Sequence, residues 1–294
     1  MEDVIIKTIL KKKVYKNEEK IKKEHDDLFI HYITFNNKDF FKKSELHLFT
    51  CLVIPNCLQN RILDCCNIVT LFFIIDDLYD ENISGQELIS EFISILDNKT
   101  INYDNQYVKM FYKIWNNIKC KSNINSLYQF SNSIKEWFYN VNLKNKDLNR
   151  QSYLSFRRIN SGFFFTLSVL RYGMDINLDE SILNNDYIKK VQNVVGDHAM
   201  LVNDLYSYEK ECIKNTSNYY HPNMITILKN TESLDTKKAI KEIIDIILNR
   251  EKQFRELIDK NPYKNEEIYK YINSLEYVMS GNHYWSTVTG RYNF

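Results

Sequence analysis

Four carboxylates follow directly on an apolar run in the first third of the chain. The run extends from Val69 to Ile75, and the next six positions hold Asp76, Asp77, Asp80 and Glu81. On an α-helix, positions four apart lie about 40° apart around the axis, so the acids form two like-charged pairs. Such pairs repel, and the negative end of the helix dipole adds to the cost. Because Mg²⁺ binds carboxylate oxygens and shares them with substrate phosphates, the spacing predicts a Mg²⁺–phosphate site beside an apolar pocket.

A second set of oxygen ligands recurs at intervals of four residues, at Asn203, Ser207 and Glu211. On a helix these side chains would form one stripe, spread over about 12 Å along the axis. A long Glu211 side chain leaning toward the helix N-terminus would bring the set close enough to share one ion near Ser207. Taken alone, each polar stretch is more often a solvated helix surface. Their occurrence together favours a metal site.

The elements that must carry these residues are expected to be helices. With 6 Gly and 3 Pro in 294 residues, the chain has too few turn residues for a β-rich or doubly wound protein, which predicts an all-α fold. A break is expected near Asn160-Ser161-Gly162, because glycine lowers helix stability. No composition shift marks a boundary, so residues 1–294 are expected to form a single domain. Helices are predicted as two or three short segments within 1–50, and then at 58–79, 84–95, 106–119, 124–142, 148–172, 186–212, 236–260 and 265–280.

Composition and charge exclude several classes of protein. The formal net charge is +1, which gives no electrostatic basis for nucleic-acid or membrane-surface binding. No apolar run approaches the 18 residues or so that a membrane span needs. The 6 cysteines form no CxxC pair, and the N-terminus lacks a signal-peptide core, so we expect a cytoplasmic protein with reduced thiols.

The two polar stretches, DDLYDE and NDLYSYEKE, resemble the two metal-binding motifs of microbial-type class I terpene synthases. The family patterns are DDxxD(E) and NDxxSxxxE. The resemblance implies a single-domain α-helical barrel in which the two motif helices face each other. It also implies three Mg²⁺ ions, with Mn²⁺ as the alternative ion, that hold the diphosphate of an isoprenoid substrate. The implied metal ligands are Asp76, Asp80, Asn203, Ser207 and Glu211.

Other positions extend the resemblance from about residue 60 to the C-terminus. Arg157 lies 203 − 157 = 46 residues before Asn203, where the family places an arginine that senses diphosphate. The helix break after it would supply groups that act on the departing diphosphate, here Asn160 and Ser161. The implied diphosphate contacts are Arg157, Lys210, Arg291 and Tyr292. Phe73, one turn before the acids, is the first candidate to face the cationic substrate. The further aromatic candidates are Phe72, Phe164, Phe165, Tyr284 and Trp285.

We therefore expect an enzyme that ionises an allylic diphosphate, with farnesyl diphosphate as the first choice. It would cyclise or rearrange the carbocation to a terpene and release diphosphate. One alternative is a trans-prenyltransferase, although that family carries a second aspartate-rich motif where this chain has Asn203 and Ser207. The other is a non-catalytic helical binding protein. Product identity and homodimer formation are left open.

Overall fold

A computed structural model describes residues 5–80, 85–99, 104–141, 148–213 and 222–292, and within these ranges it contains helices and no strand. The all-α prediction is therefore confirmed. The α-helices are α1 (Glu18–Tyr32), α2 (Lys38–Ser44), α3 (Leu46–Val53), α4 (Ile62–Asp80), α5 (Gly85–Leu96), α6 (Gln106–Lys121), α7 (Ile124–Asn140), α8 (Arg150–Asn160), α9 (Phe163–Met174), α10 (Glu180–Leu183), α11 (Asp186–Tyr208), α12 (Met224–Glu232), α13 (Thr236–Asp259) and α14 (Glu266–Val288).

Most predicted helices are found close to their expected limits, and the predicted break separates α8 from α9. The predicted end of the last helix at residue 280 is wrong, because α14 continues to Val288. The short helices α10 and α12 were not predicted. Residue 84, where one helix was predicted to begin, lies outside the described residues. The single-domain organisation stays a prediction.

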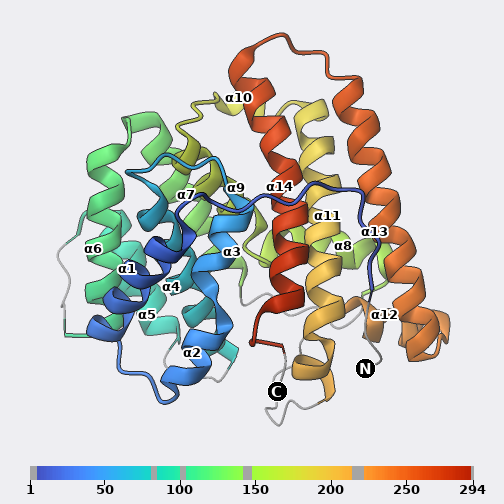
Figure 1. Cartoon of the computed structure of the whole chain (residues 1–294), viewed down its shortest axis with the longest axis horizontal. Coiled ribbons are helices and arrows are strands. Elements are labelled where there is room, and N and C mark those ends of the chain that lie inside the picture. The colour runs from blue at the N-terminus through green and yellow to red at the C-terminus, as the bar shows by residue number, and fades with distance from the viewer. Residues whose placement is uncertain (1–4, 81–84, 100–103, 142–147, 214–221, 293–294) are drawn as a thin grey trace.

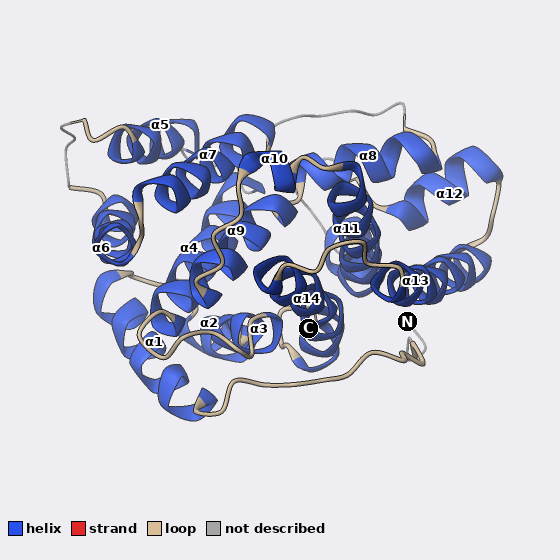
Figure 2. Ribbon diagram, turned by 90° about the horizontal axis from the view of Figure 1, so that it is seen from above, coloured by secondary structure: helices blue, strands red, loops and turns tan. Residues whose placement is uncertain are grey.

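Six helices close a ring around the centre of the molecule (Figure 1). In sequence around the ring, α3 packs on α4, α4 on α9, α9 on α8, α8 on α11, α11 on α14, and α14 on α3. The remaining helices pack outside this ring. Figure 2 looks almost along α11, α13 and α14, which stand side by side. A closed ring of this kind buries the inward face of each helix and can leave a cavity on its axis.

One glycine sets the distance between two helices of the ring. Gly281 lies inside α14, and a Cβ atom at this position would come within 2.6 Å of the backbone carbon of Leu52 in α3. No ordinary side chain fits there. The absence of a side chain thus lets the α14 and α3 backbones touch, and this contact closes the ring.

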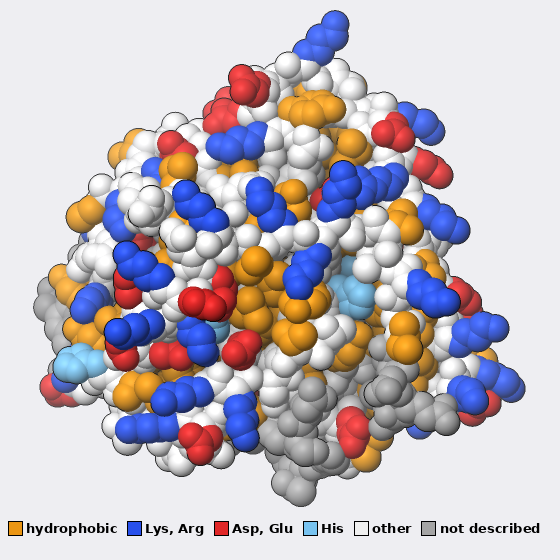
Figure 3. All heavy atoms as spheres, in the orientation of Figure 1, with side chains coloured by type: hydrophobic (Ala, Val, Ile, Leu, Met, Phe, Trp, Pro, Cys, Tyr) orange, Lys and Arg blue, Asp and Glu red, His pale blue; other side chains and the backbone are white. Residues whose placement is uncertain are grey.

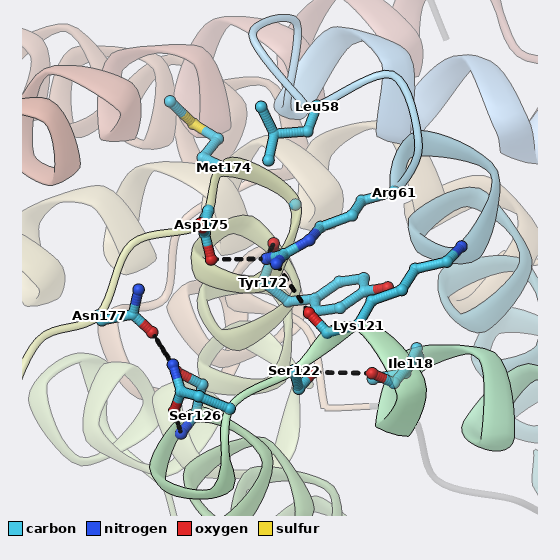
Figure 4. A network of polar contacts seen from close by, with 12 residues as sticks. Leu58, Arg61, Ile118, Lys121, Ser122, Ser126, Tyr172, Met174, Asp175 and Asn177 are labelled. Carbon is cyan, nitrogen blue, oxygen red and sulfur yellow. Dashed lines mark hydrogen bonds and ion pairs between the residues drawn. The ribbon is translucent and has the colours of Figure 1, made fainter.

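A partly buried arginine joins the far ends of three helices (Figure 4). The Arg61 guanidinium donates to the carbonyl oxygens of Tyr172 and Lys121, both at 2.7 Å, and Nη1 lies 3.0 Å from an Asp175 carboxylate oxygen. These carbonyls belong to the last turns of α9 and α6. The carbonyl groups of a last helical turn have no hydrogen-bond donor within their own helix. Arg61 therefore fixes the start of α4 relative to α6 and α9, and so fixes the direction in which α4 approaches the cavity.

The N-terminal segment crosses the outside of the ring as an extended strap (Figure 1). Its backbone N–H groups at Ile9 and Lys11 donate to Glu251 of α13 and Glu276 of α14. On the face shown in Figure 3, basic and acidic side chains are interspersed rather than separated. Within the described ranges, no helix combines the length and the apolar character that crossing a lipid bilayer requires.

Candidate active site

The ring encloses a cavity of about 200 Å³, and both predicted motifs contribute to its wall. Its polar lining residues are Asp76, Arg157, Asn160, Ser161, Asn203, Glu211, Asn282, Arg291 and Tyr292. Its aromatic carbon lining comes from Phe49, Phe72, Phe73, Trp137, Phe163, Phe165 and Trp285. The cavity thus combines metal-ligating oxygens, fixed cations and ring faces in one space.

The acids at the end of α4 occupy two different environments. Asp76 lines the cavity, where burial and the neighbouring Asp77 raise its pKa to about 6 despite nearby arginines. Burial alone would raise the pKa of Asp77, but Arg291 and Lys210 outweigh it and lower that pKa below its usual range. Asp76 is thus a carboxylate in need of a cation, whereas Asp77 already has two. The side chain of Asp80 lies outside the described residues, as does Glu81.

Asp77 holds two of the cations that were expected to contact diphosphate. Arg291 binds it through two parallel hydrogen bonds of 2.5 and 2.7 Å, and the Lys210 ammonium lies 3.4 Å away. Bidentate arginine–carboxylate pairs are among the stronger polar contacts in proteins. The Arg291 guanidinium also lies 5.3 Å from the Phe73 ring centroid. Arg291 therefore lines the cavity from the tail, whereas Lys210 is not among the residues that line it.

The second motif runs from α11 into a π-helical turn at Glu209–Ile213. The Ser207 hydroxyl donates to a Glu211 carboxylate oxygen at 2.8 Å, so these two side chains meet as the sequence predicts. The Asn203 amide donates to the Tyr292 hydroxyl at 2.7 Å. π-Helical turns are found mostly at functional sites. Here the turn carries Glu211 and Lys210 at the end of the motif helix.

Arg157 lies on the last turn of α8, just before the helix break. Its guanidinium donates to the Asn160 side-chain oxygen at 3.3 Å and lies 3.9 Å from an Asp204 oxygen. The chain then turns at Gly162, whose φ of 73° favours glycine, and a Cβ atom there would lie 3.3 Å from the Trp137 ring. The break therefore presents Asn160 and Ser161 to the cavity beside Arg157.

Asp204 is a site residue that the sequence reasoning missed. It is 1% exposed and accepts hydrogen bonds from the Tyr153 hydroxyl at 2.5 Å and from the Met224 backbone N–H at 2.9 Å. Burial raises its pKa to about 6, against the opposing effect of Arg157. Asp204 thus connects α11 to α8 and α12 directly behind Arg157. Its position next to Asn203 in the motif was the available signal.

The aromatic wall includes some of the expected rings and omits others. Phe72 stacks on Phe165 with ring centroids 4.2 Å apart and an interplanar angle of 10°. Phe73 packs against Trp285 at 5.4 Å, and both line the cavity. Phe164 and Tyr284, two further candidates, do not line it; Lys12 sits over the Tyr284 ring instead. Trp137, which was not predicted, does.

Several buried polar atoms of this site have no hydrogen-bond partner within the described residues. They include Arg157 Nε, Ser161 Oγ and Asp204 Oδ1. Buried donors and acceptors without partners are costly, and native proteins satisfy the great majority of them. A diphosphate would accept from the first two, and divalent cations would neutralise Asp76. The residues present therefore fit a metal–diphosphate group.

Comparisons with known proteins agree with this geometry. Residues 67–253 match the family model of terpene synthase family 2, C-terminal metal binding. The chain belongs to this family. It is therefore a terpene synthase with a metal-binding domain, and the resemblance seen in the sequence is confirmed.

The individual relatives named below are distant in sequence, but their alignments cover most of this chain. An aristolochene synthase from Aspergillus terreus is 26% identical, over 93% of this chain and 89% of its own. Terpene synthase 7 from Dictyostelium discoideum is 27% identical, over 81% of this chain and 75% of its own length. The crystal structure of aristolochene synthase from Penicillium roqueforti superimposes with a TM-score of 0.83 at 20% identity, covering 96% of this chain and 98% of that one. The structural match shows the isoprenoid synthase fold.

Proposed function

We propose that this terpene synthase ionises farnesyl diphosphate in a Mg²⁺-dependent reaction and converts the cation to a sesquiterpene. The observation that carries the proposal is the cavity in which Asp76, Asn203 and Glu211 meet Arg157 and a wall of aromatic rings. Three relatives are named aristolochene synthases, and aristolochene is a sesquiterpene, which supports a C15 substrate.

In this proposal the metal ligands are Asp76, Asp80, Asn203, Ser207 and Glu211. Bound Mg²⁺ ions, three on the family pattern, would neutralise the diphosphate and make it a good leaving group. The chain's own part is to place fixed positive charge where negative charge develops. Arg157 and Arg291, with Lys210 and Tyr292, would bind the diphosphate oxygens as the allylic C–O bond breaks and the electron pair leaves with the oxygen. Asn160 and Ser161 would contact the departing group from the helix break.

The hydrocarbon cation would then remain among the rings. Phe73, Phe72 and Trp285 offer faces whose attraction to a cationic carbon is worth about 0.5–2 kcal/mol each. The same wall excludes water, which would otherwise capture the cation early. Loss of a proton, or late addition of water, completes the balance and gives a terpene hydrocarbon or alcohol plus diphosphate.

Product analysis tests the proposal. The purified chain is incubated with geranyl, farnesyl or geranylgeranyl diphosphate and Mg²⁺, with and without isopentenyl diphosphate, and products are identified by gas chromatography–mass spectrometry. We expect terpene from farnesyl diphosphate alone. Products that appear only with isopentenyl diphosphate would support a prenyltransferase, and no turnover of any substrate would support a binding protein.

Two substitutions test the site assignment. Asp76→Asn and Asn203→Ala should each reduce turnover at least 100-fold, while the helical circular-dichroism spectrum is retained. Asp245→Asn and Asn273→Ala are matched controls, because both residues are exposed on helices away from the cavity. Full activity in either cavity variant would overturn the metal-site assignment.

A further inference from the structure

Two histidines and an aspartate form a compact cluster that the terpene synthase site does not use. His25 and Asp26 come from α1 and His47 from α3, and one ligand atom from each lies within 4.8 Å of the others. None of the three lines the active-site cavity. Imidazole and carboxylate together are the ligand set that zinc prefers, whereas Mg²⁺ prefers oxygen alone. The cluster therefore belongs to a different chemistry from the site described above.

Both histidines lie in the protein interior. His25 is 1% exposed and His47 is 0% exposed. A neutral imidazole has a free lone pair for a metal ion. Nδ1 of His47 is also buried without a hydrogen-bond partner in the described part of the chain.

The surroundings of each ring match those of metal-ligating histidines, which are oriented by a hydrogen bond at the second ring nitrogen. Nε2 of His25 lies 2.8 Å from the Thr70 hydroxyl, and Nε2 of His47 lies 2.5 Å from a Glu18 carboxylate oxygen. These contacts leave Nδ1 of His47 without a partner, whereas Nδ1 of His25 donates its proton to Asp26 and would exchange that proton for an ion. The His25 Nδ1 atom is already 2.9 Å from Asp26 Oδ1.

An ion bound by Asp26 Oδ1 would replace its hydrogen bond with His25 and leave its contact with Lys22 in place. Asp26 Oδ1 faces His25, while Oδ2 lies 3.3 Å from the Lys22 ammonium. In a tetrahedral zinc site, with bonds of about 2.0 Å, neighbouring ligand atoms are about 3.3 Å apart. The cluster, at up to 4.8 Å, would have to close by roughly 1.5 Å, which is within the reach of side-chain rotation.

We propose that His25, Asp26 and His47 form a second metal site that binds one zinc-class divalent ion and ties α1 to α3. Glu18 and Thr70 orient the two imidazoles, and the fourth position is left to water. Because α3 is a member of the central ring, an ion here would brace the ring from outside. This site is independent of the Mg²⁺ proposed at the cavity.

Zinc titration of the full, tag-free chain tests the proposal. After dialysis against a chelator, Zn²⁺ binding is measured by calorimetry in excess Mg²⁺, which occupies oxygen-only sites. We expect one equivalent in the wild-type chain, a higher unfolding temperature with Zn²⁺, and visible absorption bands when Co²⁺ replaces it. Asp76→Asn should bind Zn²⁺ like the wild type, which separates this site from the cavity.

Three variants make the test specific. His47→Gln should lose at least tenfold in Zn²⁺ affinity together with the Zn²⁺-dependent rise in unfolding temperature. Asp26→Asn, which keeps both imidazoles in place, should also bind Zn²⁺ at least tenfold more weakly. This variant provides the test if His47→Gln folds poorly. His31→Ala is the matched control, because His31 is an exposed histidine on the same helix. No Zn²⁺ binding by the wild type would show a purely hydrogen-bonded cluster, and wild-type-like binding in both His47→Gln and Asp26→Asn would show that the ion binds elsewhere.

Discussion

At the scale of single residues, the site depends on charges that lie behind the groups facing the cavity. Arg157 faces the cavity, but a buried carboxylate at Asp204 and the Tyr153 hydroxyl lie behind it. A guanidinium on a helix end has many rotamers, and each misplaced rotamer would weaken contact with a leaving group. Asp204 is therefore a positioning residue for Arg157.

Asp204→Asn should lower turnover by about 100-fold, because an error of about 1 Å in a group that contacts the reacting atoms can cost that much. Affinity for inorganic diphosphate with Mg²⁺, measured by calorimetry, should fall as well, while the unfolding temperature changes little. Tyr153→Phe keeps the Asp204 charge and removes one hydrogen bond, so its effect on diphosphate affinity should be smaller. Unchanged diphosphate affinity in Asp204→Asn would contradict a positioning role.

At the scale of elements, Gly281 lets the backbones of α14 and α3 come into direct contact. Gly281→Ala would place a Cβ atom 2.6 Å from the Leu52 backbone, and backbone cannot yield as a flexible side chain can. We expect a loss of about 3 kcal/mol in the free energy of unfolding, measured from the urea midpoint. Asn273→Ala on the exposed side of α14 should change stability by less than about 0.5 kcal/mol. Equal midpoints for the two variants would show that α14 and α3 can separate without cost.

The same glycine shows where sequence reasoning about the elements stops. Gly281 resembled a helix end, because glycine is a poor helix former. Its actual role depends on α3, more than two hundred residues earlier, and no local pattern contains that partner. Asp76 and the Asn203–Glu211 stripe were predictable because helical spacing alone brings their side chains together. Asp204 was not, because its partner Tyr153 lies 51 residues away.

At the scale of the whole molecule, buried histidines make stability depend on pH. His283 is 7% exposed, and burial together with the neighbouring His198 lowers its pKa to about 4 from the ordinary 6.5. The folded chain therefore binds fewer protons than the unfolded chain between these pH values. The contribution of His283 to the free energy of unfolding is fully present above pH 6.5, and it is lost as the pH drops toward 4.

At pH 5 the contribution of His283 amounts to a loss of about 2 kcal/mol relative to pH 7.5. His283→Gln cannot take up this proton, so its free energy of unfolding should fall by about 2 kcal/mol less than that of the wild type over the same interval. Urea titrations at both pH values, in chelator to exclude metal binding, provide the measurement. Parallel losses in the two proteins would assign the acid sensitivity to other groups.

The contacts of Asp77 have a consequence for turnover. Arg291 and Lys210 both contact this carboxylate, so an incoming diphosphate must compete with a tethered anion for two of the cations it needs. The apparent affinity for substrate falls in proportion to the fraction of molecules in which those cations are released from Asp77. The same competition acts on the product. When the terpene has formed, Asp77 can bind Arg291 and Lys210 again and displace the product diphosphate. The position of Asp77 beside Arg291 and Lys210 would thus protect the enzyme against product inhibition.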